Sequence, residues 1–257
     1  MTERIVAVTG SASGIGAAVA SRLRADGARV IGVDLHDAEV EADLAGAEGR
    51  DRVVAAVADA AGGRLHGLVA CAGLGPHVRP AGTIAAVNYF STVHVVDGLL
   101  PALAAAAAEG AAAVVISSNS AGITPRDDAL LGALEAGDEQ AALARADEID
   151  GAVVYGTTKL AVARGVRRRA EEWGAGGVRL NAVAPGPVDT PLLAASLADP
   201  TYGPLVDALP IPLGRRAAPD EIAAVVAFLL GPEAGYVHGS VLFADGGSDA
   251  LLRPDAV

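Results

Sequence analysis

The stretch Thr9-Gly10-Ser11-Ala12-Ser13-Gly14-Ile15-Gly16 joins an apolar run at residues 4–9 to an amphipathic segment at residues 15–26. A glycine-rich turn between a strand and a helix can hold a dinucleotide pyrophosphate, because the start of the helix presents N–H groups and a positive dipole end. In this role Gly10 permits the tight turn, Gly14 lets the backbone approach the phosphates, and Gly16 allows the helix to pack closely on the strand. The alternative for this stretch alone is an ordinary strand-to-helix turn.

Asp34 ends the second apolar run, 18 positions after Gly16. A carboxylate at this distance accepts hydrogen bonds from the ribose hydroxyls of an adenosine, whereas it would repel a 2′-phosphate. The next arginine along the chain is Arg50, so the pattern favours NAD over NADP. We expect Asp34 and its neighbour Leu35 in the cofactor site, and Asp43-Leu44 can place a carboxylate and an apolar face beside the adenine.

Short apolar runs alternate along the chain with longer segments rich in alanine and leucine. This alternation is typical of βαβ units, and uniformly apolar strands indicate a parallel sheet covered by helices on both faces. We therefore predict an α/β fold, a Rossmann-type doubly wound parallel sheet, in a single domain spanning residues 1–257. Strands are expected near Arg4–Thr9, Arg29–Val33, Gly67–Cys71, Ala113–Ser117, Val178–Val183 and Val241–Phe243. Helices are expected near Ile15–Asp26, Arg50–Ala61, Thr83–Glu109, Val154–Trp173 and Asp220–Leu230.

Two segments interrupt this alternation. Residues 126–150 are rich in alanine, leucine and acidic residues, and predict a helical insert of one or two short helices before the helix that carries Tyr155. An interaction or substrate-cover role and a solvated decoration are both open for this insert. Residues 187–216 combine prolines with many leucines, and a long connection of this kind is usually functional. They predict a lid over a hydrophobic substrate, with packing against the core or another subunit as the alternative.

The composition restricts the partners of the chain. The chain has 257 residues, and 52% of them are hydrophobic, which favours a well-buried core. Its formal net charge of −12 argues against nucleic acid or an anionic membrane as a partner. Cys71 is the only cysteine, so no intramolecular disulfide and no thiolate metal cluster can form. The five histidines lack ligand spacing, and we expect no metal. No signal peptide and no membrane-spanning run is evident, so a cytoplasmic protein is expected.

Further motifs follow the glycine-rich turn: Ala72-Gly73, Asn88, Ser117-Ser118, Tyr155-Gly156-Thr157-Thr158-Lys159, Asn181, Pro185-Gly186 and Thr190. Together with the TGxxxGxG spacing of residues 9–16, they resemble the short-chain dehydrogenase/reductase family along nearly the whole chain. Residues 37–44, 71–76, 134–137 and 236–239 are similar to the bacterial 3α-hydroxysteroid dehydrogenase/carbonyl reductase branch of that family. Cys71 replaces an asparagine common in the wider family, and the branch shares this departure.

Tyr155 and Lys159 are four positions apart on an expected helix, so both side chains project from one face. A free phenol with a pKa near 10 is ionised to roughly 0.1% at pH 7, and a nearby ammonium favours the phenolate. We therefore predict that Lys159 activates Tyr155 as a catalytic base, with a surface pair as the alternative. The resemblance implies that Ser118 orients the substrate oxygen and that Lys159 also holds the nicotinamide ribose. It implies a proton relay through Asn88, for which a structural amide at a helix kink is the alternative.

The resemblance also implies cofactor contacts on the nicotinamide side, from Ala72, Gly73, Pro185, Gly186, Val188 and Thr190. Ser118 and Tyr155 are 37 positions apart, a wider gap than in most of the family, and the additional residues fall in 126–150. In the similar branch this insert accompanies an altered dimer contact.

The expected function is NAD-dependent interconversion of a secondary alcohol and a ketone by a homo-dimer or homo-tetramer. The resemblance implies a 3α-hydroxysteroid or a related hydrophobic carbonyl compound as substrate. The alternatives are a dehydrogenase of non-steroid secondary alcohols and a non-catalytic NAD-responsive binding protein, since a fold does not fix a function.

Overall fold

The computed structural model describes residues 3–256. Its strands are β1 (Ile5–Thr9), β2 (Arg29–Asp34), β3 (Val40–Glu41), β4 (Gly67–Ala70), β5 (Ala112–Ile116), β6 (Arg179–Pro185) and β7 (Val241–Ala244). Its α-helices are α1 (Gly14–Ala25), α2 (Ala47–Ala60), α3 (Gly82–Ala85), α4 (Thr92–Ala104), α5 (Ser120–Ile123), α6 (Asp128–Ala136), α7 (Glu139–Asp147), α8 (Gly151–Arg168), α9 (Ala170–Ala175), α10 (Pro191–Ala198), α11 (Gly203–Asp207), α12 (Pro219–Leu230) and α13 (Ser248–Leu252). Residues Ala86–Ser91 form a π-helical turn, and Ala107–Glu109 and Pro232–Ala234 form 3₁₀ helices.

The strands within residues 3–256 form one parallel sheet in the order β3-β2-β1-β4-β5-β6-β7. This order confirms the predicted doubly wound fold. The chain first builds outward from β1 through β2 and β3, and then restarts on the other side of β1 with β4. At such a switch point the loops after the two central strands diverge and leave a crevice at their carboxyl ends. The glycine-rich turn follows β1 at this point.

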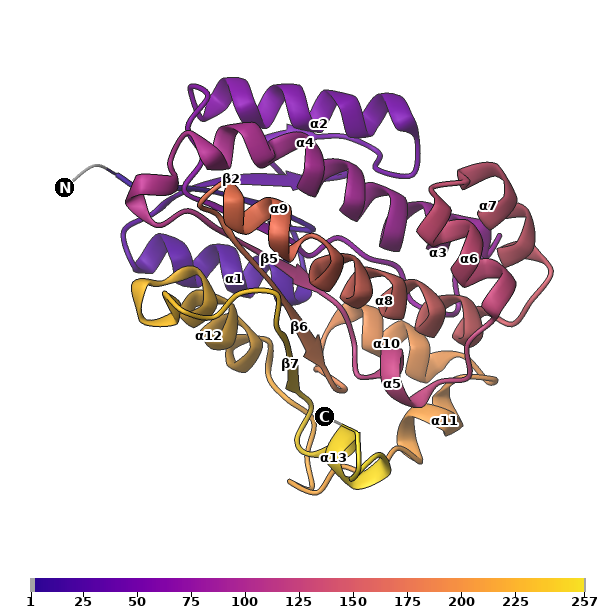
Figure 1. Ribbon diagram of the computed structural model, residues 1–257. Coiled ribbons are helices and arrows are strands. Elements are labelled where there is room, and N and C mark those ends of the chain that lie inside the picture. Colours follow the sequence, from indigo (N-terminus) through magenta and orange to yellow (C-terminus); the bar gives the residue numbers. More distant parts are fainter. Residues whose placement is uncertain (1–2, 257) are drawn as a thin grey trace.

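Helices cover both faces of the sheet, as Figure 1 shows, with α1 and α12 below the strands and α2, α4 and α8 above them. Consecutive side chains of a strand point to opposite faces, so each strand contributes to two apolar clusters. Val6 and Val8 of β1 are buried with residues of α1 and α12, while Ala7 is buried with residues of α2 and α4. Burial on both sides explains why the strands are apolar throughout their length.

The helix expected at residues 83–109 is interrupted. It divides into α3, the π-helical turn Ala86–Ser91, α4 and a 3₁₀ helix. In the widened turn the hydroxyl of Ser91 donates to the carbonyl of Val87 at 2.6 Å, and that of Thr92 donates to the carbonyl of Asn88 at 3.0 Å. Hydroxyl groups that bond to the carbonyl four residues earlier replace backbone partners, and such turns often occur at functional sites.

The insert at residues 126–150 forms two helices, α6 and α7, which lie with α10 and α11 beyond the carboxyl end of the sheet (Figure 1). Leu130, Leu134 and Ala142 are fully buried in the apolar cluster that also contains residues of α8. A solvated decoration is therefore the wrong interpretation of this insert. No helix in the described part of the chain combines the length and the apolar character needed to cross a membrane.

Candidate active site

A cavity of about 1010 Å³ opens at the carboxyl end of the sheet, between the glycine-rich turn and the helices α10 and α11. It brings together almost all residues that the sequence assigned to a cofactor or to catalysis. Its lining includes Gly10, Ser13, Gly14, Ile15, Gly16, Asp34, Leu35, Asp43, Leu44, Ala72, Gly73, Ser118, Tyr155, Lys159, Pro185, Gly186, Val188 and Thr190.

The glycine-rich turn leaves no room for side chains. Gly10 and Gly14 have φ angles of +70° and +52°, and a Cβ at Gly10 would lie 2.9 Å from the backbone of Ala72. A Cβ at Gly14 would approach Thr190 to 3.2 Å, so the two loops that face the cavity meet at this glycine. A Cβ at Gly16 would lie 1.9 Å from the carbonyl oxygen of Gly10, so the steric reason for this glycine lies inside the turn. The resulting bare backbone fits a pyrophosphate.

The carboxylate of Asp34 is held at the end of β2 by backbone N–H groups. Ala12 donates to its Oδ2 at 2.9 Å and Leu35 donates to its Oδ1 at 2.7 Å. Asp34 therefore joins the glycine-rich turn to β2 and faces the cavity that the turn lines. A fixed carboxylate beside a phosphate-binding turn is suited to a ribose diol.

Ser118, Tyr155 and Lys159 meet at the inner part of this cavity, although Ser118 follows β5 and the other two lie on α8. Ser118 hydrogen-bonds to the phenol of Tyr155, and Lys159 Nζ lies 5.8 Å from the centre of the Tyr155 ring. The neighbouring Ser117 turns away, because its hydroxyl donates to the carbonyl of Lys159 at 2.9 Å. The insert loops out between β5 and α8, so the long sequence gap does not separate serine and tyrosine.

Burial dominates the proton affinities of these groups. It raises the pKa of Tyr155 above its ordinary value, and the hydrogen bond from Ser118 opposes this rise. Burial also lowers the pKa of Lys159 to about 8 and raises that of Cys71 to about 12. The expected depression of the pKa of Tyr155 by Lys159 is therefore not seen in this cavity, where burial raises that pKa. Lys159 Nζ instead donates to the carbonyl of Ile116 at 2.9 Å.

Two of the predicted site residues turn their side chains away from the cavity. Asn88 accepts a hydrogen bond from the N–H of Leu74 at 2.7 Å and donates to its carbonyl at 3.0 Å, as a structural amide does. Asn88 also lies in the π-helical turn. The structure therefore shows the alternative stated for this residue, a structural amide at an irregular part of a helix. The hydroxyl of Ser11 is directed to the carbonyl of Val33 at 3.4 Å. Only the backbones of these two residues remain available for the predicted roles.

The segment at residues 187–216 forms the outer wall of the cavity. The large side chains of this segment that line it include Leu192, Leu193, Tyr202, Leu205, Val206 and Leu209. Thr190 begins α10 as its N-cap, because its hydroxyl oxygen accepts from the N–H of Leu193 at 3.2 Å. The wall is therefore largely apolar along the two short helices α10 and α11. Leu205 remains 62% exposed, which fits a wall that covers the cavity only loosely.

Sequence reasoning missed a polar contact that joins this wall to α8, the helix that carries Tyr155 and Lys159. The hydroxyl of Tyr202 donates to Oδ2 of Asp150 at 3.1 Å and accepts from Arg79 at 2.9 Å. Asp150 is the N-cap of α8, and its Oδ1 accepts from the N–H of Ala152. An Asp at the start of an expected helix is an N-cap signal, and it would have moved the predicted start from Val154 to Gly151.

Comparison with known proteins agrees with this geometry. Residues 4–127 match the short chain dehydrogenase family, and residues 140–249 match a family described as Enoyl-(Acyl carrier protein) reductase. The chain is 46% identical over 254 residues to a 3-alpha-hydroxysteroid dehydrogenase/carbonyl reductase of Comamonas testosteroni, with 97% of this chain and 98% of the relative covered. This chain belongs to the short-chain dehydrogenase family. The short-chain dehydrogenase described here is thus an oxidoreductase.

Two further relatives are named for different activities. This short-chain dehydrogenase is 32% identical over 264 residues to the cis-4-hydroxycyclohexanecarboxylate dehydrogenase of Sinomonas cyclohexanicum, covering 97% of this chain and 98% of the relative. It is also similar to the crystal structure of the 3-alpha-hydroxysteroid dehydrogenase from Pseudomonas sp. B-0831 complexed with NADH. That likeness has a TM-score of 0.93 at 46% identity and covers 98% of this chain and 100% of the other.

Proposed function

We propose that this short-chain dehydrogenase uses NAD to interconvert a hydrophobic secondary alcohol and its ketone, with a 3α-hydroxysteroid or a related cyclic carbonyl compound as substrate. The observation that carries the proposal is the meeting of the Ser118 and Tyr155 hydroxyls at the inner end of a cavity whose outer wall is apolar. A polar end that can hold one oxygen and an apolar wall that can hold a carbon skeleton suit a bulky alcohol of low polarity.

The residues around the adenosine end favour NAD over NADP. Asp34 is fixed by two backbone N–H groups and would repel a 2′-phosphate at the ribose. Arg50, the next arginine along the chain, is 3% exposed and directs its guanidinium to Glu139 and to two backbone carbonyls. No arginine between Asp34 and Arg50 can offset the carboxylate.

The side chains at the inner end can move one proton and stabilise one developing negative charge. When bound, NAD supplies the ring that takes up or returns the hydride at the alcohol carbon. In the oxidation direction the phenolate of Tyr155 takes the proton of the substrate hydroxyl, and in the reduction direction the neutral phenol gives its proton to the carbonyl oxygen. Ser118 donates to the same oxygen and stabilises the charge that develops there. Because burial raises the pKa of Tyr155, the neutral phenol is ready to act as the acid in reduction.

Lys159 supports this chemistry from beside the phenol, with its Nζ 5.8 Å from the centre of the Tyr155 ring. One of its N–H groups donates to the carbonyl of Ile116, and the other two remain for the ribose and for proton transfer. Its pKa of about 8 lies near neutral pH, where a group can both accept and release a proton. The backbone of Asn88 at the π-helical turn is the position from which we propose the relay to continue through water.

A substrate screen tests the proposal. NADH formation is measured at 340 nm with purified protein, NAD⁺ and two sets of alcohols: 3α-hydroxysteroids, and simple cyclic or aliphatic secondary alcohols. We expect oxidation of the steroids with NAD⁺ and much weaker oxidation with NADP⁺. Activity confined to the small alcohols would replace the steroid class, and the cyclohexanecarboxylate relative makes cyclic alcohols the first alternative to examine.

The variant Tyr155→Phe tests the catalytic assignment in the same assay. It removes the only hydroxyl that can exchange the substrate proton while keeping the ring, so turnover should fall by at least about a hundredfold. The dissociation constant for NADH, measured by titration calorimetry, should remain within about twofold of the wild-type value because the ring still fills its place. Near-normal turnover would show that the proton moves by another route.

Two proposals concern the environment of the enzyme. We expect a homo-dimer or homo-tetramer, supported by large apolar side chains exposed on α12, β7 and α13, which are Phe228, Phe243, Leu251 and Leu252. Light scattering of the purified protein checks this.

We also expect a cytoplasmic enzyme, because a lone cysteine needs no oxidising compartment. Fractionation of the source cells checks that.

A further inference from the structure

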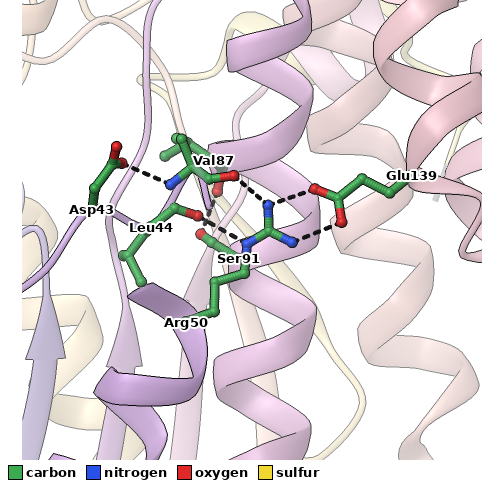
Figure 2. Close-up of polar contacts among 7 residues, drawn as sticks. Asp43, Leu44, Arg50, Val87, Ser91 and Glu139 are labelled. Atoms are coloured by element: carbon green, nitrogen blue, oxygen red, sulfur yellow. Dashed lines mark hydrogen bonds and ion pairs between the residues drawn. The ribbon is translucent and has the colours of Figure 1, made fainter. Parts of the chain in front are cut away.

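Arg50 is a buried cation with two sets of partners, shown in Figure 2. Its Nε donates to the carbonyl of Leu44 at 2.9 Å, and its Nη2 donates to the carbonyl of Ala45 at 2.6 Å. The far edge of the guanidinium donates to both carboxylate oxygens of Glu139, at 2.9 and 2.6 Å. Arg50 lies in the first turn of α2, whereas Glu139 begins α7 of the insert, 89 positions later.

The loop that Arg50 holds is part of the cavity wall. Asp43, Leu44 and Ala45 line the cavity beyond Asp34, on the side where an adenine would lie. Asp43 Oδ1 accepts from the N–H of Ala45 at 2.8 Å, which closes a tight turn. A Cβ at Gly49 would lie 1.8 Å from the carbonyl oxygen of Asp43, so the loop packs directly on α2. The position of this wall therefore follows the position of the Arg50 guanidinium.

Glu139 supplies the countercharge for Arg50. Its carboxylate is the only ion-pair partner of Arg50 among residues 3–256. A buried guanidinium without a carboxylate is costly, and it lowers that cost by turning toward water. Such a turn would break the hydrogen bonds to the carbonyls of Leu44 and Ala45. Glu139 is 37% exposed, so water can solvate its carboxylate even without Arg50. The ion pair therefore serves to keep Arg50 buried, and it is not needed to hold Glu139 in place.

The helix that carries Glu139 is fixed at its other end as well. Asp147, the last residue of α7, accepts a hydrogen bond from the N–H of Gly82 at 2.6 Å. Gly82 begins α3, and the next residue, Thr83, lines the cavity. Ala142 and Ala146 between these ends are fully buried. The helix α7 thus connects two parts of the cavity wall without lining the cavity itself.

We propose that Glu139 is a positioning residue for the adenine end of the cofactor site: through Arg50 it holds the loop Asp43–Ala45 in the shape that receives the adenosine. This gives the insert a role in cofactor affinity, and it rests on the proposed use of NAD. The insert acts on the adenosine half of the cofactor and leaves the chemistry at Tyr155 unchanged.

The variant Glu139→Gln tests this with ligands that carry only one half of the cofactor. Titration calorimetry gives dissociation constants for NADH and for ADP-ribose. Steady-state reduction of the ketone substrate is followed with NADH and with the reduced form of nicotinamide mononucleotide. We expect dissociation constants about tenfold higher for NADH and ADP-ribose. We expect an unchanged kcat at saturating NADH, and an unchanged rate with the reduced mononucleotide, which has no adenosine.

Glu135→Gln is the matched control. Glu135 is also an insert glutamate that pairs with arginines, but its partners Arg164 and Arg168 lie on α8, and neither lines the cavity. Its loss should leave all dissociation constants at the wild-type values. An equal loss of ADP-ribose affinity in both variants, or an equal loss of mononucleotide activity in Glu139→Gln, would show a general structural effect and overturn the proposal.

Arg50→Lys provides an independent test, because a lysine keeps a positive charge near Glu139 but lacks the fork that reaches both carbonyls. We expect the same selective loss of ADP-ribose and NADH affinity. Wild-type affinity for ADP-ribose in either Arg50→Lys or Glu139→Gln would overturn the role of the pair. If the wild-type protein itself binds neither ADP-ribose nor NADH, the proposed use of NAD fails first, and the inference fails with it.

Discussion

At the scale of single residues, orientation separates neighbours that the sequence presents as equivalent. Ser117 and Ser118 are adjacent, yet Ser117 bonds to the backbone of Lys159 and Ser118 bonds to Tyr155. Both residues follow the end of β5 and line the cavity, but the hydroxyl of Ser117 is already engaged by a backbone carbonyl. The resemblance selected Ser118, and the hydrogen bond of Ser117 gives the physical reason for that choice.

Asp34 offers the sharpest residue-scale prediction about the cofactor. The variant Asp34→Ala removes both the acceptor for the ribose hydroxyls and the repulsion of a 2′-phosphate. The affinity for NADH relative to that for NADPH should therefore fall by about tenfold or more. Fluorescence titration of the variant and the wild type with both dinucleotides measures this ratio.

Asp43→Ala is the control for that ratio. Asp43 also lines the cavity with a carboxylate, but it lies beyond the place expected for the ribose and accepts from the N–H of Ala45. Its loss should weaken NADH and NADPH to the same extent. A wild-type protein that prefers NADPH, or a ratio that is unchanged in Asp34→Ala, would contradict the assignment of Asp34.

The glycines of the proposed cofactor site were predictable because the conformation of the backbone requires them. Gly10 and Gly14 have positive φ angles, and Gly16 faces a carbonyl at a distance that no Cβ tolerates. The directions of the Ser11 and Asn88 side chains were not predictable. Each depends on a backbone group brought near by folding, at Val33 and Leu74, and no local pattern encodes such a partner.

At the scale of elements, the sequence predicted the order of strands and helices but not the interruptions. The π-helical turn leaves no mark in the pattern of residues 83–109, because all six of its residues are buried and no polar face signals a change of phase. The start of α8 was missed by three residues, although Asp150 carries an N-cap signal. Contacts of the insert were beyond prediction, since Glu139 and Arg50 are 89 positions apart.

Tyr202 links three elements, and its hydroxyl can be removed without disturbing its ring. The ring is 3% exposed, and the hydroxyl joins α11 to Asp150 at the start of α8 and to Arg79 after β4. In Tyr202→Phe the free energy of unfolding should fall by about 1 kcal/mol. Amide exchange at residues 199–209 should accelerate by a larger factor than elsewhere, because the link fixes this wall locally.

Tyr236→Phe is the control for this link. Tyr236 is fully exposed, so loss of its hydroxyl should change neither the free energy of unfolding nor the exchange of residues 199–209. Mass spectrometry of exchanged peptides and urea unfolding measure the two quantities. Equal exchange of residues 199–209 in Tyr202→Phe and the wild type would show that apolar packing alone holds the wall.

At the scale of the whole molecule, the sheet brings distant segments to one edge. The strand order places β1 beside β4, and the segments that follow β1, β2, β4, β5 and β6 all line the same cavity. The insert and the two helices α10 and α11 then cover this edge. Alternating periodicity was enough to predict the layers, whereas the closure of the cavity depends on contacts between segments that are far apart in sequence.

Burial of Lys159 links the site to the stability of the whole protein. Lys159 is the only lysine in the sequence and is 4% exposed. Its pKa is lowered from 10.5 to about 8, so between these values the unfolded chain binds a proton that the folded chain does not. The free energy of unfolding therefore rises with pH across this window, and below about pH 8 the buried ammonium reduces it.

The variant Lys159→Met removes this titration, and the groups that titrate nearby, Tyr155 and Cys71, remain in both proteins. Relative to the variant, the wild-type free energy of unfolding should rise by about 3 kcal/mol as pH goes from 7 to 10.5. Urea unfolding at several pH values measures the difference. In protein with ¹⁵N-labelled lysine, the single side-chain signal should titrate near pH 8. A signal that titrates near 10.5, with a pH-independent difference between the two proteins, would show that water reaches Lys159 and that burial does not set its proton affinity.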